Sequence, residues 1–398
     1  MIGLVEIRDA EARVSAVIRA TPVDRSDSLS EIARRPVILK PEHRQRTGSF
    51  KIRGAFNFVS RLAPGTEVVA ASAGNHAQGV ALAARLTGLR STIFMPAGAA
   101  LPKVAATKGY GATVRLGGAA VDDCIDQAKA YAAGVGATYV PPFDDPLILA
   151  GQGTIGLELA EEAPGAEVVV VPVGGGGLIA GIATALAQVG AGMRVVGVEA
   201  AGAACVRAAL QAGHPVRLEH LATMADGIAI RSTSALALDH IRAYVDEVVT
   251  VDEEEISRAM LLLLERAKSV VEPAGAVGLA AVLAGRVPGQ GPAICVLSGG
   301  NIDPLLLIKL IGHGLSAAGR YLVLRIVIDD RPGALADLTA RLAATDVNVL
   351  DVEHHRSGFR LGLSEVEVLI TVETRDAHHR GAVVSDLQQA GYRVELVH

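Results

Sequence analysis

The feature that most constrains this chain is an alternation of short strand-like and longer helix-like segments, which begins at Glu67. Runs rich in β-branched residues are predicted strands: Glu67–Ser72, Ser91–Met95, Ala112–Leu116, Ala137–Val140, Glu167–Val173, Arg194–Glu199 and Ala293–Leu297. Ala- and Leu-rich stretches of helical period lie between them: Ala77–Leu86, Lys103–Lys108, Val121–Ala133 and Leu178–Gln188. This order predicts an α/β fold with parallel sheets covered by helices on both faces.

A different pattern follows residues 312–320, a stretch rich in glycine and small residues that we interpret as a linker. The predicted elements after it are strand Tyr321–Ile328, helix Ala334–Ala344, strand Val347–His354, strand Ser364–Val372, helix Ala377–Ala390 and strand Tyr392–Val397. The order βαββαβ is that of a ferredoxin-like unit. We therefore predict a large domain over 1–315 and a small one over 321–398.

Charge and cysteine usage exclude several classes of protein. The 37 basic and 42 acidic residues form no basic cluster, so we expect no nucleic-acid partner. Apolar runs such as Val168–Val173 are too short to span a bilayer, and the first residues do not resemble a signal peptide. The three cysteines are far apart, which argues against a disulfide framework and a zinc site. We expect a cytoplasmic protein.

The segment Thr47–Ala55 contains a candidate catalytic lysine. Ser49 is a plausible helix N-cap, which would place Lys51 in the first turn on a small, apolar helix face. A desolvated lysine has a lowered pKa and can form a Schiff base. The alternative is a lysine that only extends from a half-buried helix towards solvent.

The segment Ser72–His76 follows a predicted strand and precedes a helix. A turn there would expose backbone N–H groups that suit a carboxylate. Asn75 could instead be a simple N-cap, and His76 a solvated residue of the first helical turn.

Four consecutive glycines, Gly174–Gly177, follow the most apolar strand. Bare backbone at a helix N-terminus suits a phosphate group. Gly175, Gly177 and Ala180 also match a dinucleotide-binding pattern, with Glu199 at the end of the next strand. The motif Ser298–Asn301 would lie at the carboxyl end of another strand, where open α/β sheets bind ligands.

Together these segments resemble the threonine dehydratases (threonine ammonia-lyases), which are fold-type II pyridoxal-phosphate enzymes. The resemblance extends from about Thr21 to Arg320. It rests on Gln45–Ala55, Ala71–Gly79, Pro142–Pro146, Ala150–Thr154, Gly174–Gly181, Ala225–Gly227 and Leu297–Asp303. It implies a catalytic domain of two parallel-sheet α/β subdomains, the smaller one inserted at about 65–145.

The resemblance also implies roles towards pyridoxal 5'-phosphate. Lys51 would hold the cofactor covalently and later move the substrate's α-proton, and Phe50 would pack against its ring. Asn75 would bond its phenolic oxygen, and Ser298 would face its pyridine nitrogen. The phosphate would bind at Gly174, Gly175, Gly176 and Gly177. A serine offers the ring nitrogen only a neutral hydrogen bond, which favours prompt loss of the substrate's β-hydroxyl group.

The implied reaction removes water and then ammonia from L-threonine to give 2-oxobutanoate, and from L-serine to give pyruvate. Ser72 would act with Lys51 as a catalytic residue. The substrate carboxylate would bind at Ser72, Ala73, Gly74, Asn75 and His76. Related serine racemases carry a second serine at the position of Ala73, where it serves as the acid/base on the opposite face, so racemisation is disfavoured here.

Some relatives bind a divalent cation through a glutamate and a carboxylate six residues later. Here Glu199 is followed at that spacing by Cys205, which is a poor ligand for hard cations. We therefore predict no metal site.

Residues 321–398 resemble an ACT domain, a regulatory module for small ligands. The resemblance rests on the turn Asp329–Leu335 and on Asn348. The candidate effector contacts are Asp330, Gly333, Ala334, Leu335 and Asn348. The family implies a branched-chain amino acid as effector and a homodimer or homotetramer. The alternative is a dimerisation module that binds no ligand.

Other functions stay open at this point. A dehydratase of 3-hydroxyaspartate and a β-replacement synthase are alternatives within the family. An NAD-linked dehydrogenase would use the glycine pattern but leaves the other motifs unexplained. A catalytically idle amino-acid sensor is disfavoured by Lys51.

Overall fold

The computed structural model describes residues 1–317, 320–356 and 361–397. It divides into two compact units, Met1–Asp303 and Pro304–His398, called here the N-terminal and C-terminal units. Each is described by itself.

The larger sheet of the N-terminal unit has six strands in the order β1-β2-β10-β7-β8-β9. All neighbours are parallel except β1, which is antiparallel to β2. The strands are β1 (Asp24–Arg25), β2 (Val37–Lys40), β10 (Ala293–Val296), β7 (Val168–Pro172), β8 (Arg194–Ala200) and β9 (Glu247–Val251). The helices that accompany this sheet are α1 (Leu4–Val14), α2 (Asp27–Ala33), α3 (Lys51–Val59), α7 (Pro146–Glu162), α8 (Gly177–Gln188), α9 (Cys205–Ala212), α10 (Ala235–Tyr244), α11 (Glu253–Glu265) and α12 (Pro273–Leu283).

Strand β7 is buried throughout because both faces of the sheet are covered. Its alternate residues Val169 and Val171 belong to a core that also contains Ile179 and Ile182 of α8. On the other face, α12 approaches so closely that a Cβ added at Gly278 would lie 3.3 Å from the carbonyl oxygen of Val170. The nearly all-apolar composition of this strand thus follows from burial on both sides.

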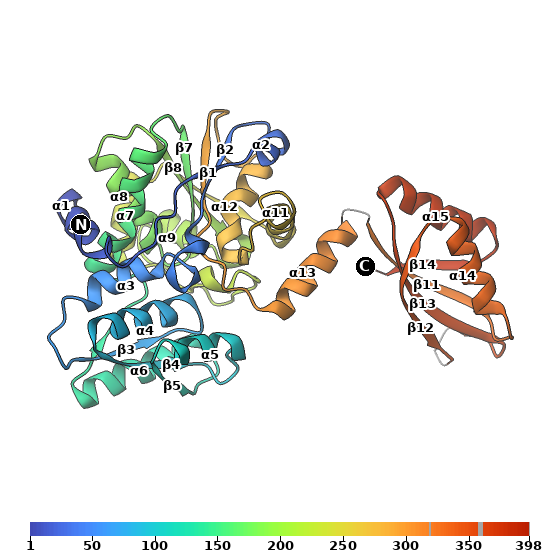
Figure 1. Ribbon diagram of the computed structural model, residues 1–398, viewed down its shortest axis with the longest axis horizontal. Coiled ribbons are helices and arrows are strands. Elements are labelled where there is room, and N and C mark those ends of the chain that lie inside the picture. Colours follow the sequence, from blue (N-terminus) through green and yellow to red (C-terminus); the bar gives the residue numbers. More distant parts are fainter. Residues whose placement is uncertain (318–319, 357–360, 398) are drawn as a thin grey trace. The chain divides into compact units, whose positions relative to one another are not determined.

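The smaller sheet is parallel and has the order β5-β4-β3-β6. Its strands are β3 (Glu67–Ala71), β4 (Arg90–Met95), β5 (Thr113–Leu116) and β6 (Thr138–Tyr139), and its helices are α4 (Asn75–Thr87), α5 (Leu101–Gly109) and α6 (Val121–Val135). Alternate strand residues face opposite layers. Val69 and Ala71 share a core with α6, whereas Val68 and Ala70 share one with α3 and α4. Figure 1 shows this sheet below the larger one, next to α3.

The predicted α/β class with two parallel sheets is confirmed. The sequence analysis predicted strands only from Glu67 onward. It therefore did not predict β2, which lies inside the large sheet. Strand β9 and helices α10, α11 and α12 were also missed.

The C-terminal unit contains helix α13 (Pro304–Ala317) followed by a four-stranded antiparallel sheet of order β12-β13-β11-β14. The elements in chain order are β11 (Tyr321–Asp329), α14 (Ala334–Ala344), β12 (Asn348–His355), β13 (Glu365–Glu373), α15 (Ala377–Gln389) and β14 (Arg393–Val397). The predicted βαββαβ order is confirmed. Alternate residues of β11 are buried against Leu338 and Leu342 of α14.

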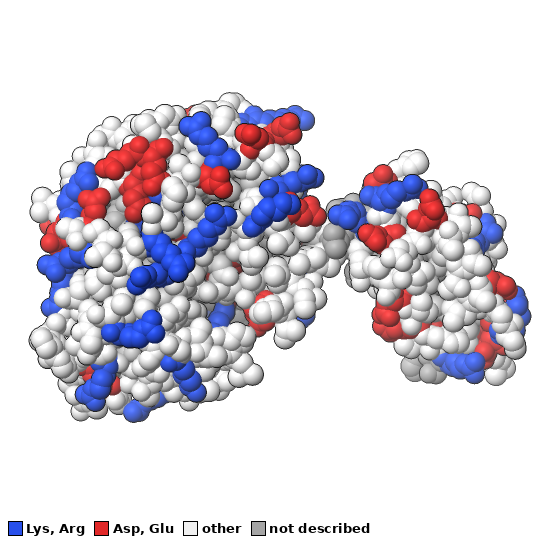
Figure 2. Space-filling model, viewed as in Figure 1, with Lys and Arg blue, Asp and Glu red and all other residues white. Residues whose placement is uncertain are grey.

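Helix α13 covers the first part of the expected linker at 312–320, so that stretch is helical as far as Ala317. Residues 318 and 319 lie outside the described residues. Within the described ranges, no helix is long and apolar enough to cross a membrane. Basic and acidic side chains are interspersed on the face seen in Figure 2.

Candidate active site

A cavity of about 490 Å³ lies at the carboxyl ends of strands from both sheets of the N-terminal unit. It brings together all four predicted segments. The predicted residues that line it are Phe50, Lys51, Ser72, Ala73, Gly74, Asn75, His76, Gly174, Gly175, Gly176, Gly177 and Ser298. Residues more than 240 positions apart in the chain therefore meet in one place.

Lys51 begins helix α3 and extends its amine into this cavity. Its Nζ donates a hydrogen bond to the carbonyl oxygen of Pro142 (2.8 Å) and lies 5.1 Å from the centre of the Phe50 ring. Burial lowers the pKa of the amine to about 8, and the charge of Glu272 opposes this only in part. A substantial fraction of the amine is thus neutral near pH 7.5 and can act as a nucleophile.

The predicted capping role of Ser49 is wrong. Phe50 occupies the N-cap position of α3, and the Ser49 hydroxyl is buried with no hydrogen-bond partner among the described residues. Ser49 instead forms a backbone bridge with Gly299, and the Phe50 N–H donates to the carbonyl oxygen of Ser298 (3.2 Å). These backbone contacts hold Lys51 and Ser298 in a fixed relation, which local capping rules could not reveal.

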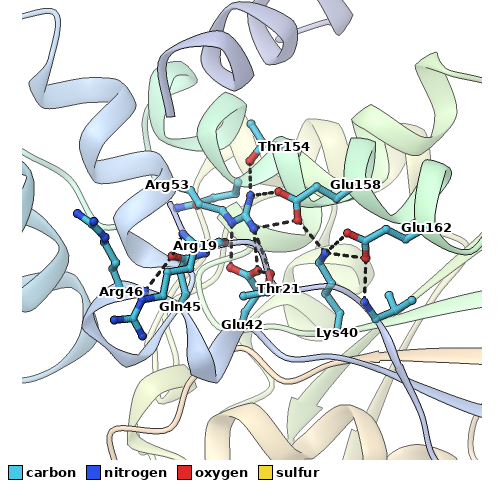
Figure 3. A network of polar contacts seen from close by, with 12 residues as sticks. Arg19, Thr21, Lys40, Glu42, Gln45, Arg46, Arg53, Thr154, Glu158 and Glu162 are labelled. Atoms are coloured by element: carbon cyan, nitrogen blue, oxygen red, sulfur yellow. Dashed lines mark hydrogen bonds and ion pairs between the residues drawn. The ribbon is translucent and has the colours of Figure 1, made fainter. Parts of the chain in front are cut away.

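Arg53 lies on the same helix as Lys51, and its buried ion pairs hold helix α3 in place. Figure 3 shows its guanidinium between Glu42 and Glu158. It donates to both carboxylate oxygens of Glu42 (2.9 and 2.7 Å) and to both of Glu158 (2.6 and 3.0 Å). Lys40 extends the network to Glu158 and Glu162. Burial would raise the pKa of Glu42, but the Arg53 charge holds this pKa below its ordinary value. The network ties α3 to β2 and α7.

Asn75 is the first residue of α4, whose N-cap is Gly74, so the simple N-cap alternative for Asn75 is wrong. Its side-chain amide donates to Glu272 (2.6 Å) and its carbonyl oxygen accepts from Asn301 (2.7 Å). This chain of hydrogen bonds fixes the Asn75 side chain against the cavity.

The alternative of a solvated His76 is also wrong, since this side chain is buried. Its Nε2 lies 2.9 Å from the carbonyl oxygen of Val140. Burial, followed by the charge of Lys51, lowers the pKa of His76 to about 3. The ring is therefore neutral at physiological pH and donates its Nε2–H to Val140.

Glu272 was missed, although it lines the cavity. Burial, followed by the negative charge of Asp226, raises the pKa of its carboxyl group to about 7. A Cβ added at Gly299 would overlap Oε1 of Glu272, so only glycine fits beside it. The signal available in the sequence was a single carboxylate before Pro273 in an otherwise apolar run.

The turn that begins at Ser72 lies between β3 and α4. The Ser72 hydroxyl accepts a hydrogen bond from the Gly74 N–H (3.1 Å). None of the described side chains caps the N-terminus of α4, which begins where Ala73 and Gly74 line the cavity, so its first backbone donors remain for a ligand. These donors suit the carboxylate of an amino acid.

The glycine loop Gly174–Gly177 leads from β7 into α8. A Cβ at Gly175 would overlap the Phe143 ring, and one at Gly177 would lie 2.8 Å from the Phe143 Cβ. Gly176 has φ +93°, which other residues rarely adopt. The N-terminus of α8 has no cap from a described side chain, so its donors remain for a ligand. The loop therefore fits a phosphate group, opposite a lysine that can bind a carbonyl carbon.

Glu199, the acidic residue of the dinucleotide alternative, is engaged elsewhere. It is buried and accepts hydrogen bonds from the N–H groups of Val206 (2.7 Å) and Arg207 (2.9 Å) at the start of α9. The Cys205 thiol points at the carbonyl oxygen of Gly174 (3.6 Å). The described residues contain no cluster of three or more metal-ligating side chains.

These contacts lead to a prediction on metal dependence. Because Glu199 already binds two backbone N–H groups, we expect the activity to be unchanged after exhaustive treatment with a chelator. Activity and thermal stability measured before and after dialysis against EDTA test this. A loss that Mg²⁺ or Ca²⁺ restores would contradict the prediction of no metal site.

In the C-terminal unit, Gly333 is the N-cap of α14 with φ +91°, and Ala334 is buried behind it. The Asp330 N–H donates a hydrogen bond to the carbonyl oxygen of Ser364 (2.8 Å), and the Asp330 carboxylate forms an ion pair with Arg356 (3.4 Å). Leu335 is partly buried in the core of this unit, whereas Asn348 is exposed at the start of β12. An effector role of these residues stays a prediction.

A lysine that faces an open glycine loop at the carboxyl ends of parallel strands defines, with this fold, a pyridoxal-phosphate-dependent enzyme. The family model described as "pyridoxal-phosphate dependent enzyme" matches residues 14–299, and that of the ACT domain matches residues 322–391. Within this class, the chain belongs to the threonine ammonia-lyases. The predicted family and cofactor are confirmed, and the dinucleotide alternative loses its basis.

The similarity to characterised proteins covers the whole chain. An L-threonine ammonia-lyase of Geobacter sulfurreducens is 46% identical over 407 residues, which cover all of both chains. One of Thermotoga maritima is 44% identical over 401 residues with the same coverage. A solved threonine deaminase from T.th. is 40% identical with a TM-score of 0.72, and the match covers 76% of this chain and 99% of that one.

Proposed function

We propose that this protein removes water and then ammonia from L-threonine to give 2-oxobutanoate, and acts on L-serine to give pyruvate. The observation that carries the proposal is the cavity that joins Lys51, the turn at Ser72 and the glycine loop in one site. The names of the full-length relatives support the choice of threonine.

Bound pyridoxal phosphate supplies an electron sink for the negative charge that develops at the substrate's α-carbon. In our proposal, Gly174–Gly177 and the N-terminus of α8 bind the phosphate, and Lys51 binds the reactive carbon. Phe50 packs against the ring and Ser298 faces its nitrogen. Asn75 has one amide N–H beyond that used by Glu272, and this N–H is available to the phenolic oxygen.

Lys51 also takes the α-proton, for which its lowered pKa is suited because a general base works best near the operating pH. The backbone donors of the turn Ser72–His76 hold the substrate carboxylate, and the Ser72 hydroxyl lies beside them. Ala73 presents a methyl group, which cannot deliver a proton to the second face. Racemisation is therefore disfavoured.

The proposal is tested by release of 2-oxo acid from L-threonine, L-serine and L-threo-3-hydroxyaspartate. We expect the highest kcat/KM with L-threonine and a lower one with L-serine. Turnover without added nicotinamide would exclude the dehydrogenase and the idle-sensor alternatives. Absence of 2-oxo acid from every substrate, with cofactor bound, would reject the proposed function.

Replacing Ser298 with aspartate is expected to slow elimination. An aspartate would keep the ring nitrogen protonated and prolong the life of the carbanion, which favours side reactions over loss of the hydroxyl group. We expect a fall in kcat of at least roughly tenfold, or about 1.4 kcal/mol in the barrier, together with a changed absorbance of the bound cofactor. The matched control is Ser298→Ala, which removes the hydroxyl without adding charge. An unchanged rate and spectrum in Ser298→Asp would show that residue 298 does not face the nitrogen.

We further propose that the C-terminal unit binds a branched-chain amino acid and regulates the enzyme as a homodimer or homotetramer. The ACT match and the uncapped start of α14 at Gly333 support this. We also propose a cytoplasmic location, since Cys124, Cys205 and Cys295 are unpaired thiols, as is typical of a reducing compartment.

The regulatory proposal predicts that isoleucine or valine shifts the apparent KM for threonine in the full-length protein. Such coupling typically amounts to about 1–3 kcal/mol. A chain that ends near residue 319 should keep the cofactor and its activity but lose this response. The T.th. deaminase, whose match covers only 76% of this chain, supports such a truncation. If calorimetry on the full-length protein detects no amino acid beyond the active site, the unit has no effector role.

A further inference from the structure

Besides Lys51 and Glu272, the cavity is lined by paired charges to which the proposed reaction assigns no role. The charged residues that line the cavity are Lys51, Lys103, Asp122, Arg217, Asp226, Arg231 and Glu272. Lys103 Nζ lies 2.5 Å from Asp226, and Arg217 lies 2.6 Å from Asp122. The Nε of Arg231 lies 3.4 Å from the same carboxylate oxygen of Asp122. One carboxylate, that of Asp122, therefore engages two guanidinium groups.

Asp122 belongs to the smaller sheet's side of the cavity, whereas both arginines come from the segment between α9 and α10. It lies in the first turn of α6, where Val121 and Ile125 also line the cavity. Arg231 is positioned independently by hydrogen bonds to the carbonyl oxygens of Leu218 (3.1 Å) and Glu219 (2.5 Å). It would thus remain in place without Asp122.

The contribution of these ion pairs to folding stability is small, because the side chains of Arg217 and Asp122 are 65% and 42% exposed. Their main effect is on the potential that an incoming substrate meets. A second carboxylate on the substrate would need an unpaired cation at the cavity. Asp122 neutralises two such cations and repels the carboxylate itself. It also offsets the positive end of the α6 helix dipole.

We propose that Asp122 makes this site selective for β-hydroxy amino acids with a single carboxylate, by holding Arg217 and Arg231 in ion pairs and repelling dicarboxylic substrates. The adjacent apolar surface of Val121 and Ile125 suits the methyl group of threonine rather than a charged group. This inference rests on the proposed function and names its substrate class. It disfavours the 3-hydroxyaspartate dehydratase.

The test compares kcat/KM for L-threo-3-hydroxyaspartate with that for L-threonine in the parent and in Asp122→Asn. Asparagine keeps the shape of the side chain and removes its charge. We expect the parent to favour threonine strongly, and the ratio to shift towards hydroxyaspartate by at least roughly tenfold in the variant. Succinate, a dicarboxylate that cannot react, should inhibit the variant at a correspondingly lower concentration. The matched control is Asp126→Asn, which removes the same charge from an exposed position of α6 outside the cavity and should leave the ratio unchanged.

A second variant, Asp122→Asn combined with Arg217→Gln, separates release of the arginine from simple loss of repulsion. We expect this double variant to lose most of the shift towards hydroxyaspartate that Asp122→Asn shows in the kcat/KM ratio. A gain that persists undiminished would overturn the role of Arg217. An unchanged ratio and unchanged succinate inhibition in Asp122→Asn would overturn the selectivity role of Asp122, as would a parent that uses both substrates equally well. Lack of threonine turnover in the parent would reject the proposed function instead.

Discussion

Replacing Lys51 with alanine is expected to reduce turnover of L-threonine by roughly a thousandfold or more. The variant loses both the amine that binds the cofactor and the base that takes the α-proton. The absorbance of the lysine-bound cofactor should disappear as well. The protein should stay folded, because the Lys51 side chain makes one hydrogen bond, to Pro142, and points into the cavity. Steady-state assays, absorbance spectra and circular dichroism measure these three effects.

The control for Lys51→Ala is Lys108→Ala, which removes an exposed lysine from α5 outside the cavity. This control should retain both turnover and cofactor absorbance. Normal turnover in Lys51→Ala would reject the catalytic assignment. A loss of activity accompanied by unfolding would show that Lys51 is structural.

The second large effect is expected at Arg53, which is fully buried with Glu42. Replacing Arg53 with methionine would leave the buried Glu42 carboxylate without its partner. Breaking a buried ion pair in this way typically costs about 3–5 kcal/mol. Scanning calorimetry should show a markedly lower unfolding temperature for the N-terminal unit. Turnover by the remaining folded protein should also fall, since α3 carries Lys51 on the same helix.

The matched control is Arg286→Met, which removes an arginine from an exposed pair with Glu255. Such a pair contributes about 0–1 kcal/mol, so the unfolding temperature should change little. Arg53→Lys should fall between the two, because a lysine keeps the charge but cannot bridge two carboxylates with a planar fork. Equal effects of Arg53→Met and Arg286→Met would contradict the importance of the buried network.

The alternation of segments after Glu67 was sufficient to predict both the α/β class and the order of the C-terminal unit. Strand Val168–Pro172 and helix Ala334–Ala344 were predictable because their hydrophobic periods are local properties of the chain. Strand β2 was not predicted, because its four residues before Pro41 are too few to show a recognisable hydrophobic periodicity. Only its pairing with β10 makes it a strand inside the sheet.

Some residues of the candidate site could likewise be predicted from the sequence, and others could not. Lys51 and the glycine loop were predictable, because a lysine in a small apolar segment and four consecutive glycines are unusual in any context. Glu272 was missed because its importance comes from Asn75, 197 residues away in the chain. Asp122 was missed because a carboxylate in the first turn of a helix is common, and its two arginines lie in a distant segment.

The sequence by itself determined the fold class, the family and the lysine and glycine motifs, since these depend on residue types at short spacing. Only the tertiary structure decided that Phe50 rather than Ser49 is the N-cap of α3, that His76 is neutral and buried, and that Asp122 engages Arg217 and Arg231. Capping, burial and ion pairing depend on which distant groups exclude water or supply charge. A protein's pKa values and selectivity arise from these neighbours, which are not adjacent in sequence.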